Sequence, residues 1–135
     1  TTLAQGGTRP QLLGTELWSG ENSIANSQPL RGALFSAVSD ARYRQFVTSY
    51  EARFGEQPYR IATLGYDAVL LTLRIAREWR PGRDFPSTMM IDADGFLGLD
   101  GPFRFNGNGV GERAMEVRQV GNGTVTVVDQ APARF

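Results

Sequence analysis

Two helical periods of apolar side chains dominate the first half of the chain. The first begins after Ser39-Asp40, which predict an N-cap, and ends at Gly55, which predicts a C-terminal cap. Apolar side chains recur between them at helical spacing, at Tyr43, Phe46, Val47, Tyr50 and Phe54. Arginine and other polar residues occupy the opposite side. This pattern predicts an amphipathic helix that lies on a sheet.

The second helical period runs from Ile61 to Trp79 and is broader than the first. One apolar stripe consists of Ile61, Leu64, Ala68, Leu71, Ile75 and Trp79. Further apolar residues widen it, so we expect this helix to be more deeply buried than the first. Pro81-Gly82 ends it, and a short helix is predicted at 87–91.

Strand patterns flank these helices. Residues 1–10 are predicted to form a loop and 11–13 a buried strand. Residues 32–38 form a nearly continuous apolar run, which is typical of a strand covered on both faces. Alternating patterns at 103–105 and 116–120 predict further strands. Asn122-Gly123 then predicts a hairpin turn, with 124–128 as the returning strand. The fold class expected is α/β with a C-terminal β-hairpin.

Composition excludes several kinds of chemistry. The chain has 41% hydrophobic and 21% charged residues, which is typical of a globular domain. Its fourteen basic residues, all arginine, balance fourteen acidic ones, so no basic field attracts nucleic acid. The lack of Cys and His excludes disulfides, thiol nucleophiles, the usual zinc sites and Ser-His-Asp catalysis. No carboxylate pair is placed for hydrolysis. We therefore predict no catalytic residue, metal or cofactor.

Three motifs suggest ligands but fit simpler structures better. Asp92, Asp94 and Asp100 form an acidic stretch, and Asp92-x-Asp94-Gly95 resembles the start of a calcium loop. Its later ligand positions are Phe96 and Phe103, so a turn whose Asp side chains cap local backbone N–H groups is expected instead. The glycine-rich segment 107–112 lacks the lysine and the helix of a phosphate loop, and a chain reversal is expected. The series Arg74, Arg77, Arg80 and Arg83 is expected to be a solvated helix face.

Glu16 and Trp18 form the most informative candidate site. They follow the predicted strand 11–13, and ligands of open α/β sheets bind beyond the carboxyl ends of strands. A carboxylate there can hold an ammonium group, and an indole can cover an apolar or sugar face. The alternative is a loop Glu and a Trp folded back on the core. Tyr66 points its hydroxyl into a cleft or merely packs, and Asp67 is expected to bond local backbone.

The order of five segments resembles a known family. These are LLGTELWS, LRGALFSAVSD, the helix end YEARFGEQP, the helix start GYDAV and the hairpin GFLGLDGPFRF. In this order they are similar to the C-terminal portion of type I periplasmic binding proteins, the leucine or branched-chain amino-acid-binding family. Within it, the resemblance is strongest to the penicillin-binding-protein activators.

The resemblance implies a Rossmann-like, two-lobed fold with a ligand cleft between the lobes. Residues 1–58 would be the end of lobe two, and 59–135 would return into lobe one and include a hinge-crossing hairpin. Glu16 would bind the ammonium group of a ligand, with Leu17 and Trp18 beside it. Tyr66 would take a cleft-facing position. Other cleft residues of the family would lie outside this chain.

The function implied is that of a non-catalytic solute-binding module of an ABC transporter. Its ligand would be a small amino acid or amide, its partner a membrane permease, and its location the periplasm, with or without a lipid anchor on the full-length parent. The alternative is a cell-envelope regulator that docks a penicillin-binding protein, a cell-wall synthase. Surfaces left uncovered in this portion imply self-association, through exchange of the C-terminal hairpin.

Overall fold

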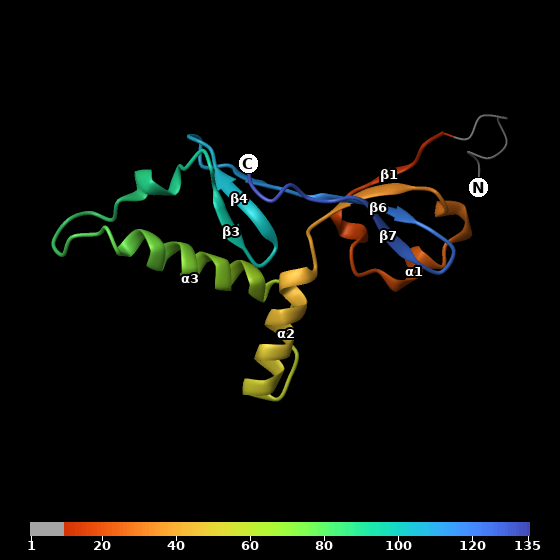
Figure 1. Cartoon of the computed structure of the whole chain (residues 1–135), viewed down its shortest axis with the longest axis horizontal. Helices are drawn as coiled ribbons and strands as arrows, with labels where there is room; N and C mark the ends of the chain where they lie inside the picture. The colour runs from red at the N-terminus through yellow and green to blue at the C-terminus, as the bar shows by residue number, and fades with distance from the viewer. Residues whose placement is uncertain (1–9) are drawn as a thin grey trace. The chain divides into compact units, whose positions relative to one another are not determined.

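The structure, a computed structural model, describes residues 10–135, which form two compact units (Figure 1). The first unit comprises the chain up to Val38 together with Met115–Ala131. The second comprises Ser39–Ala114 and Pro132–Phe135. The loop expected at 1–10 lies outside the described residues except for Pro10. Among the helices of the described part, none has the length and apolar character to cross a membrane.

The first unit is built on a four-stranded sheet with the order β1-β2-β6-β7. Its strands are β1 (Leu13–Gly14), β2 (Leu34–Ala37), β6 (Glu116–Val120) and β7 (Val125–Asp129). β1 pairs with β2 in parallel, whereas β2–β6 and β6–β7 are antiparallel. The predicted C-terminal hairpin is confirmed, and Gly123 in its turn has a φ of 77°, a conformation that favours glycine.

Short helices connect β1 to β2. They are η2 (Glu16–Trp18), α1 (Asn22–Ala25) and η3 (Gln28–Leu30). The core of this unit consists of Ala33, Phe35, Ala37 and Val120, against which Leu12, Trp18, Ile24 and Leu30 pack. The chain therefore folds the segment after β1 back over the sheet.

Two strands are less buried than the sequence predicts. The strand expected as buried at 11–13 is the two-residue edge strand β1, and Leu13 is 75% exposed. Successive side chains point to opposite faces, and Leu12 rather than Leu13 packs against the core. The apolar run at 32–38 does contain β2. Its residues, however, alternate between buried and half-buried, so β2 is fully covered on one face rather than two.

The second unit places helices beside a small antiparallel sheet of order β3-β4-β5. Its elements are α2 (Ala41–Phe54), α3 (Ala62–Ala76), η4 (Ser87–Met90), β3 (Phe96–Gly98), β4 (Gly101–Phe105) and β5 (Gly111–Arg113). Leu71 and Ile75 of α3 pack with Phe96 and Phe103 in its core. Phe85, Met90 and Phe105 line the margin of this cluster.

Helix α2 begins and ends where the sequence predicts. The Ala41 N–H lies 3.5 Å from Ser39 Oγ, and Gly55 takes a left-handed φ of 76° at the C-terminal end. The prediction that this helix lies on a sheet is wrong within the described residues, because no residue of α2 is buried. The aromatic residues of α2 instead pack against one another, and the ring centroids of Tyr50 and Phe54 are 4.5 Å apart.

Helix α3 is more buried than α2, as predicted, but through a different face. Its buried residues are Thr63, Asp67, Leu71 and Ile75, which follow one another at intervals of four. Only Leu71 and Ile75 belong to the predicted apolar stripe. Two polar side chains complete the buried row because the turn between β3 and β4 supplies partners for them, as the contacts below show.

Candidate functional site

The turn Glu16–Trp18 lies just beyond the carboxyl end of β1. It is a single 3-10 turn, in which the Ser19 N–H donates to the Glu16 carbonyl at 2.9 Å. Glu16 and Leu17 are exposed, and Trp18 is half-buried. Within residues 10–135, the Glu16 carboxylate has no hydrogen bond or ion pair, so it is open to a ligand or solvent.

Trp18 packs back onto the first unit's core. Its ring centroid lies 5.8 Å from that of Phe35. A Cβ placed on Gly14 would lie 2.5 to 2.7 Å from indole atoms of Trp18, so the indole rests directly on the Gly14 backbone. This is the arrangement of the alternative in which the Trp folds onto the core. The contact of its exposed part with a ligand stays a prediction.

Tyr66 lies on α3 in the second unit. It is 44% exposed, and its ring centroid is 5.3 Å from that of Phe46 on α2. The four predicted binding residues therefore divide between the units: Glu16, Leu17 and Trp18 are consecutive in the first, and Tyr66 belongs to the second. Their common role in one site stays a prediction.

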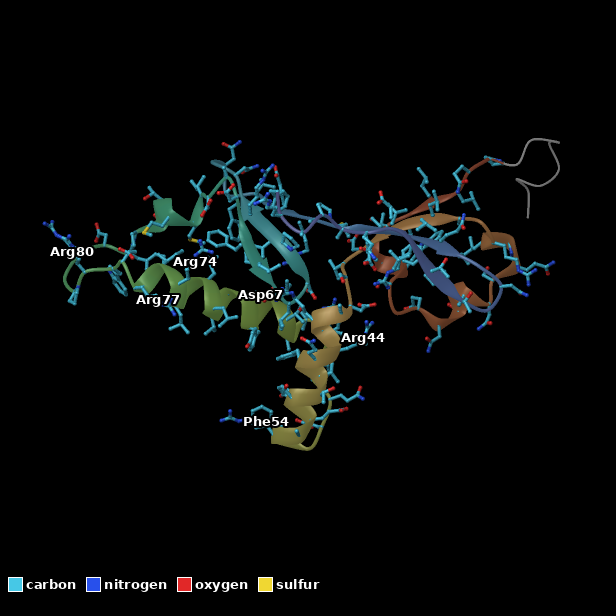
Figure 2. All side chains as sticks on the ribbon, in the orientation of Figure 1. Arg44, Phe54, Asp67, Arg74, Arg77 and Arg80 are labelled. Atoms are coloured by element: carbon cyan, nitrogen blue, oxygen red, sulfur yellow. The ribbon has the colours of Figure 1, made fainter. Side chains whose placement is uncertain are left out.

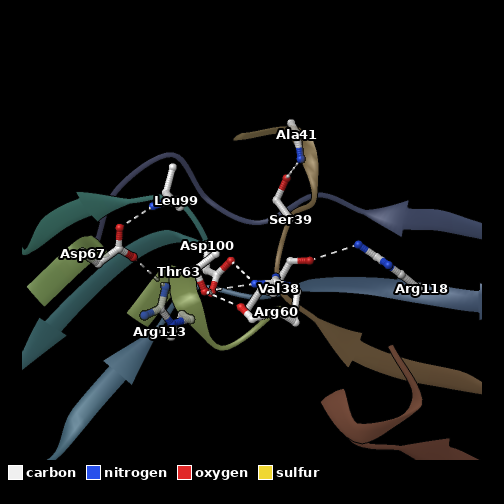
Figure 3. Close-up of polar contacts among 10 residues, drawn as sticks. All are labelled: Val38, Ser39, Ala41, Arg60, Thr63, Asp67, Leu99, Asp100, Arg113 and Arg118. Carbon is white, nitrogen blue, oxygen red and sulfur yellow. Dashed lines mark hydrogen bonds and ion pairs between the residues drawn. The ribbon is translucent and has the colours of Figure 1, made fainter. Parts of the chain in front are cut away.

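A buried carboxylate on α3 organises the second unit. Asp67 is 4% exposed, and its Oδ1 accepts a hydrogen bond from the Leu99 N–H at 2.8 Å (Figure 3). Its Oδ2 lies 4.0 Å from Arg113 Nη1 on β5. Burial raises the pKa of Asp67 above its ordinary value, although the Leu99 N–H and the Arg113 charge act in the opposite direction.

A second buried carboxylate, Asp100, sits in the turn between β3 and β4. Its Oδ2 accepts a hydrogen bond from Thr63 Oγ1 at 2.8 Å, and its Oδ1 lies 2.7 Å from Arg60 Nη1 (Figure 3). The Arg60 guanidinium lies 4.2 Å from the centre of the Tyr43 ring. The turn is thereby tied to both α2 and α3. Both carboxylates hold structure together, because Asp67 binds the Leu99 N–H and Asp100 binds Thr63 and Arg60, although Asp67 also lines a small pocket beside β3.

Sequence reasoning missed this pair of contacts. The prediction that Asp67 bonds local backbone is wrong, since its donor is 32 positions away in the sequence. The turn-capping prediction is confirmed for Asp92, whose Oδ1 accepts from the Asp94 N–H at 3.0 Å, but is wrong for Asp100. One sequence pattern pointed to these contacts: Thr63 and Asp67 are four residues apart, which places both on one face of a helix.

The glycine-rich segment takes the chain reversal expected of it, whereas the arginine series forms a helix face only in part. Asn106 and Gly109 form the turn that reverses the chain from β4 to β5, with the Gly109 N–H donating to the Asn106 carbonyl at 2.9 Å. The side chains of Arg74, Arg77, Arg80 and Arg83 are exposed as expected, but α3 ends at Ala76, so only Arg74 lies within the helix. Arg74 Nη2 also lies 3.7 Å from Asp92 Oδ2. Figure 2 shows three of them along the C-terminal half of α3 and beyond it.

A comparison with solved structures gives the fold class. The chain is similar to a protein assigned to branched-chain amino acid ABC transport from Rhodospirillum rubrum, with a TM-score of 0.71 and 22% identity over 94% of this chain and 39% of that one. It is also similar to a leucine-binding protein from Thermotoga maritima (TM-score 0.50, 23% identity, 93% of this chain and 38% of that one). A third is a solute-binding protein from R. palustris in complex with benzoate (TM-score 0.52, 23% identity, 91% and 37%).

These similarities define a fold rather than a particular protein. The chain has the α/β fold of part of a type I periplasmic binding protein, as the sequence predicted. It spans less than two-fifths of the length of the three proteins above. No protein-family profile matches the chain, and no curated protein matches its sequence significantly.

Proposed function

We propose that these residues belong to a longer, non-catalytic solute-binding protein of an ABC transporter. The single observation that carries the proposal is the TM-score of 0.71 over 94% of this chain with a protein assigned to branched-chain amino acid transport. The Thermotoga maritima protein is a leucine-binding protein. The R. palustris protein is a solute-binding protein in complex with benzoate. The protein proposed therefore takes up small solutes from the periplasm and delivers them to a membrane permease.

The ligand proposed is a small amino acid or amide held between two lobes of the longer protein. Residues 1–58 would complete lobe two, and 59–135 would return into lobe one. Glu16 would accept hydrogen bonds from the ligand's amino group, which its exposure and free carboxylate support. Leu17 and Trp18 would cover apolar parts of the ligand, and Tyr66 would contribute from the other lobe. An ammonium held by a carboxylate is worth about 1.5–3 kcal/mol, enough to select amines over neutral analogues.

Calorimetric titration of the longer protein tests this proposal. A panel of the twenty amino acids, their amides and benzoate is titrated into the longer protein and into the 135-residue chain. We expect saturable binding of an amino acid or amide by the longer protein and none by the short chain, which would lack much of the cleft. Glu16→Gln should weaken binding of the amine ligand by about ten- to a hundredfold, because a charged hydrogen-bond acceptor becomes neutral.

Glu21→Gln is the matched control, since Glu21 is also exposed in the same connection between β1 and β2. It should leave affinity unchanged. Equal effects of the two substitutions would remove Glu16 from the site. A longer protein that binds nothing in the panel, but retains a penicillin-binding protein on a column, would overturn solute binding in favour of the cell-envelope regulator.

A further inference from the structure

Three Asn-Gly pairs occur in the chain, and the structure places each of them in a turn. They are Asn106-Gly107, Asn108-Gly109 and Asn122-Gly123. The first two lie between β4 and β5, and the third lies between β6 and β7. An Asn followed by Gly loses its side-chain amide readily, because glycine has no Cβ to hinder approach to its nitrogen and moves freely. The sequence does not rank the three pairs, whereas their hydrogen bonds do.

Deamidation requires the side-chain carbon of Asn to meet the next backbone nitrogen. That nitrogen attacks Cγ and forms a C–N bond, the bond from Cγ to the side-chain nitrogen breaks, and ammonia leaves with the proton of the attacking N–H. Water then opens the resulting succinimide ring at either carbonyl carbon, which gives aspartate or isoaspartate. A hydrogen bond to the Asn side chain or from the Gly N–H slows the first step, because it must break before the two atoms meet.

The pair at 122–123 is held at both reacting groups. Arg31, at the end of η3, donates through Nη2 to Asn122 Oδ1. The Gly123 N–H donates to the Ala25 carbonyl at 2.9 Å, at the end of α1. Hydrogen bonds from a guanidinium are stronger than those between neutral groups. Both the carbon that is attacked and the nitrogen that attacks it are therefore tied to other segments of the first unit.

The pair at 106–107 is held through its side chain. Asn106 Oδ1 accepts hydrogen bonds from the N–H groups of Asn108 and Val110, both at 3.0 Å. Asn106 is also half-buried. Rotation of its side chain toward the Gly107 nitrogen breaks or distorts both bonds, so the structure slows this pair as well.

Asn108 has a free side chain. Within residues 10–135 that side chain makes no hydrogen bond, and residues 107–110 around it are exposed. One bond restrains its reaction, from the Gly109 N–H to the Asn106 carbonyl at 2.9 Å, and bonds at exposed turn tips open easily. We infer that Asn108 is the site at which the folded protein deamidates first. The product carries a new negative charge in the β4–β5 turn, and isoaspartate also lengthens the backbone there by one carbon. The inference is independent of the proposed function.

Incubation of the folded protein at mildly alkaline pH, followed by fragmentation mass spectrometry, measures deamidation at each Asn separately. We expect Asn108 to react at least about tenfold faster than Asn106 and Asn122, because each of those must first break hydrogen bonds. The same incubation in concentrated urea gives the rates of the unfolded chain. There the three Asn should react at similar rates, since all three precede Gly.

Arg31→Ala tests the protection of Asn122 directly, because it removes the guanidinium donor. The rate at Asn122 should rise by about tenfold, and the rates at Asn106 and Asn108 should stay the same. Arg42→Ala is the matched control, since Arg42 is also exposed and has no contact with the turn, and it should change none of the three rates. A variant that had unfolded would be recognised by faster reaction at Asn106 as well.

Three results would overturn the inference. The first is reaction at Asn106 or Asn122 as fast as at Asn108 in the folded protein. The second is an unchanged ranking in urea, which would show that the folded structure does not set it. The third is an unchanged rate at Asn122 in Arg31→Ala, which would show that these hydrogen bonds do not control the reaction.

Discussion

The carboxylate of Asp67 occupies the space in which a Cβ on Gly98 would lie. From that position, Asp67 Cγ is 2.6 Å and Oδ1 is 2.9 Å away, closer than side-chain carbons approach one another. The absence of a side chain at Gly98 lets α3 approach the end of β3 closely enough for Asp67 to accept the Leu99 N–H. The contact between helix and hairpin thus depends on this pair of residues.

Gly98→Ala should destabilise the second unit. The added methyl group forces the buried carboxylate away from the Leu99 N–H, and overpacking of this kind costs about 1–3 kcal/mol. Urea unfolding followed by circular dichroism measures the loss. Gly107→Ala is the control, because a Cβ there meets nothing within 4 Å. Equal losses in the two variants would contradict the close approach of Asp67 and Gly98.

The stability of the chain should depend on pH through Asp67. Its pKa in the folded chain is raised above the ordinary 3.8, mainly by burial, so the folded chain holds the proton more tightly than the unfolded chain. The resulting stabilisation is present below pH 3.8 and is lost as the pH rises through the raised pKa. Asp67→Asn removes this titration.

Urea unfolding at several pH values measures the effect as a difference between the two proteins. The free energy of unfolding of the wild type, minus that of Asp67→Asn, should fall as the pH rises above 3.8. Asp84→Asn, at an exposed position, is the control and should give a nearly constant difference. A constant difference for Asp67→Asn as well would refute the raised pKa.

Asp100→Ala should also lower the free energy of unfolding. It removes one acceptor of the Thr63 hydroxyl and the ion-pair partner of Arg60. The Thr63 hydroxyl keeps the Arg60 carbonyl as an acceptor at 3.0 Å, so the expected cost is that of one hydrogen bond to a charged group, about 1.5–3 kcal/mol. Thermal unfolding by calorimetry measures the change, with Asp84→Ala as the exposed control, expected within about 0.5 kcal/mol of the wild type. Indistinguishable midpoints for the two variants would mean that Asp100 does not tie the turn to the helices.

Gly14→Ala should displace the indole of Trp18. A Cβ at this position would lie within 2.7 Å of three indole atoms, so the ring must leave Phe35. Trp79→Phe is introduced as the background, because the chain has two Trp residues and Trp18 then reports alone. Tryptophan fluorescence measures the change, and the emission maximum of Trp18 should shift to longer wavelength as its indole enters water. An unshifted spectrum, like that expected of Gly107→Ala in the same background, would show that Trp18 does not rest on Gly14.

Local patterns determined much of the secondary structure. The helical period from Tyr43 to Phe54, closed by Gly55, gave both ends of α2 because capping and glycine conformation act within a few residues. Asn122-Gly123 likewise predicted the hairpin of β6 and β7, since turn geometry sets which strands meet. The exposed Glu16 turn after β1 was also placed from the sequence, whereas its part in binding remains a prediction.

Tertiary structure decided which faces are buried. The apolar stripe of α3 suggested one buried side, yet the buried row includes Thr63 and Asp67, because Leu99 and Asp100 approach from more than thirty residues away to satisfy them. The aromatic stripe of α2 predicted a covering sheet that the described residues do not provide. By itself, the sequence determined where helices, turns and strands form, because those depend on neighbouring residues. Burial depends on which distant segments meet, and only the folded chain decides that.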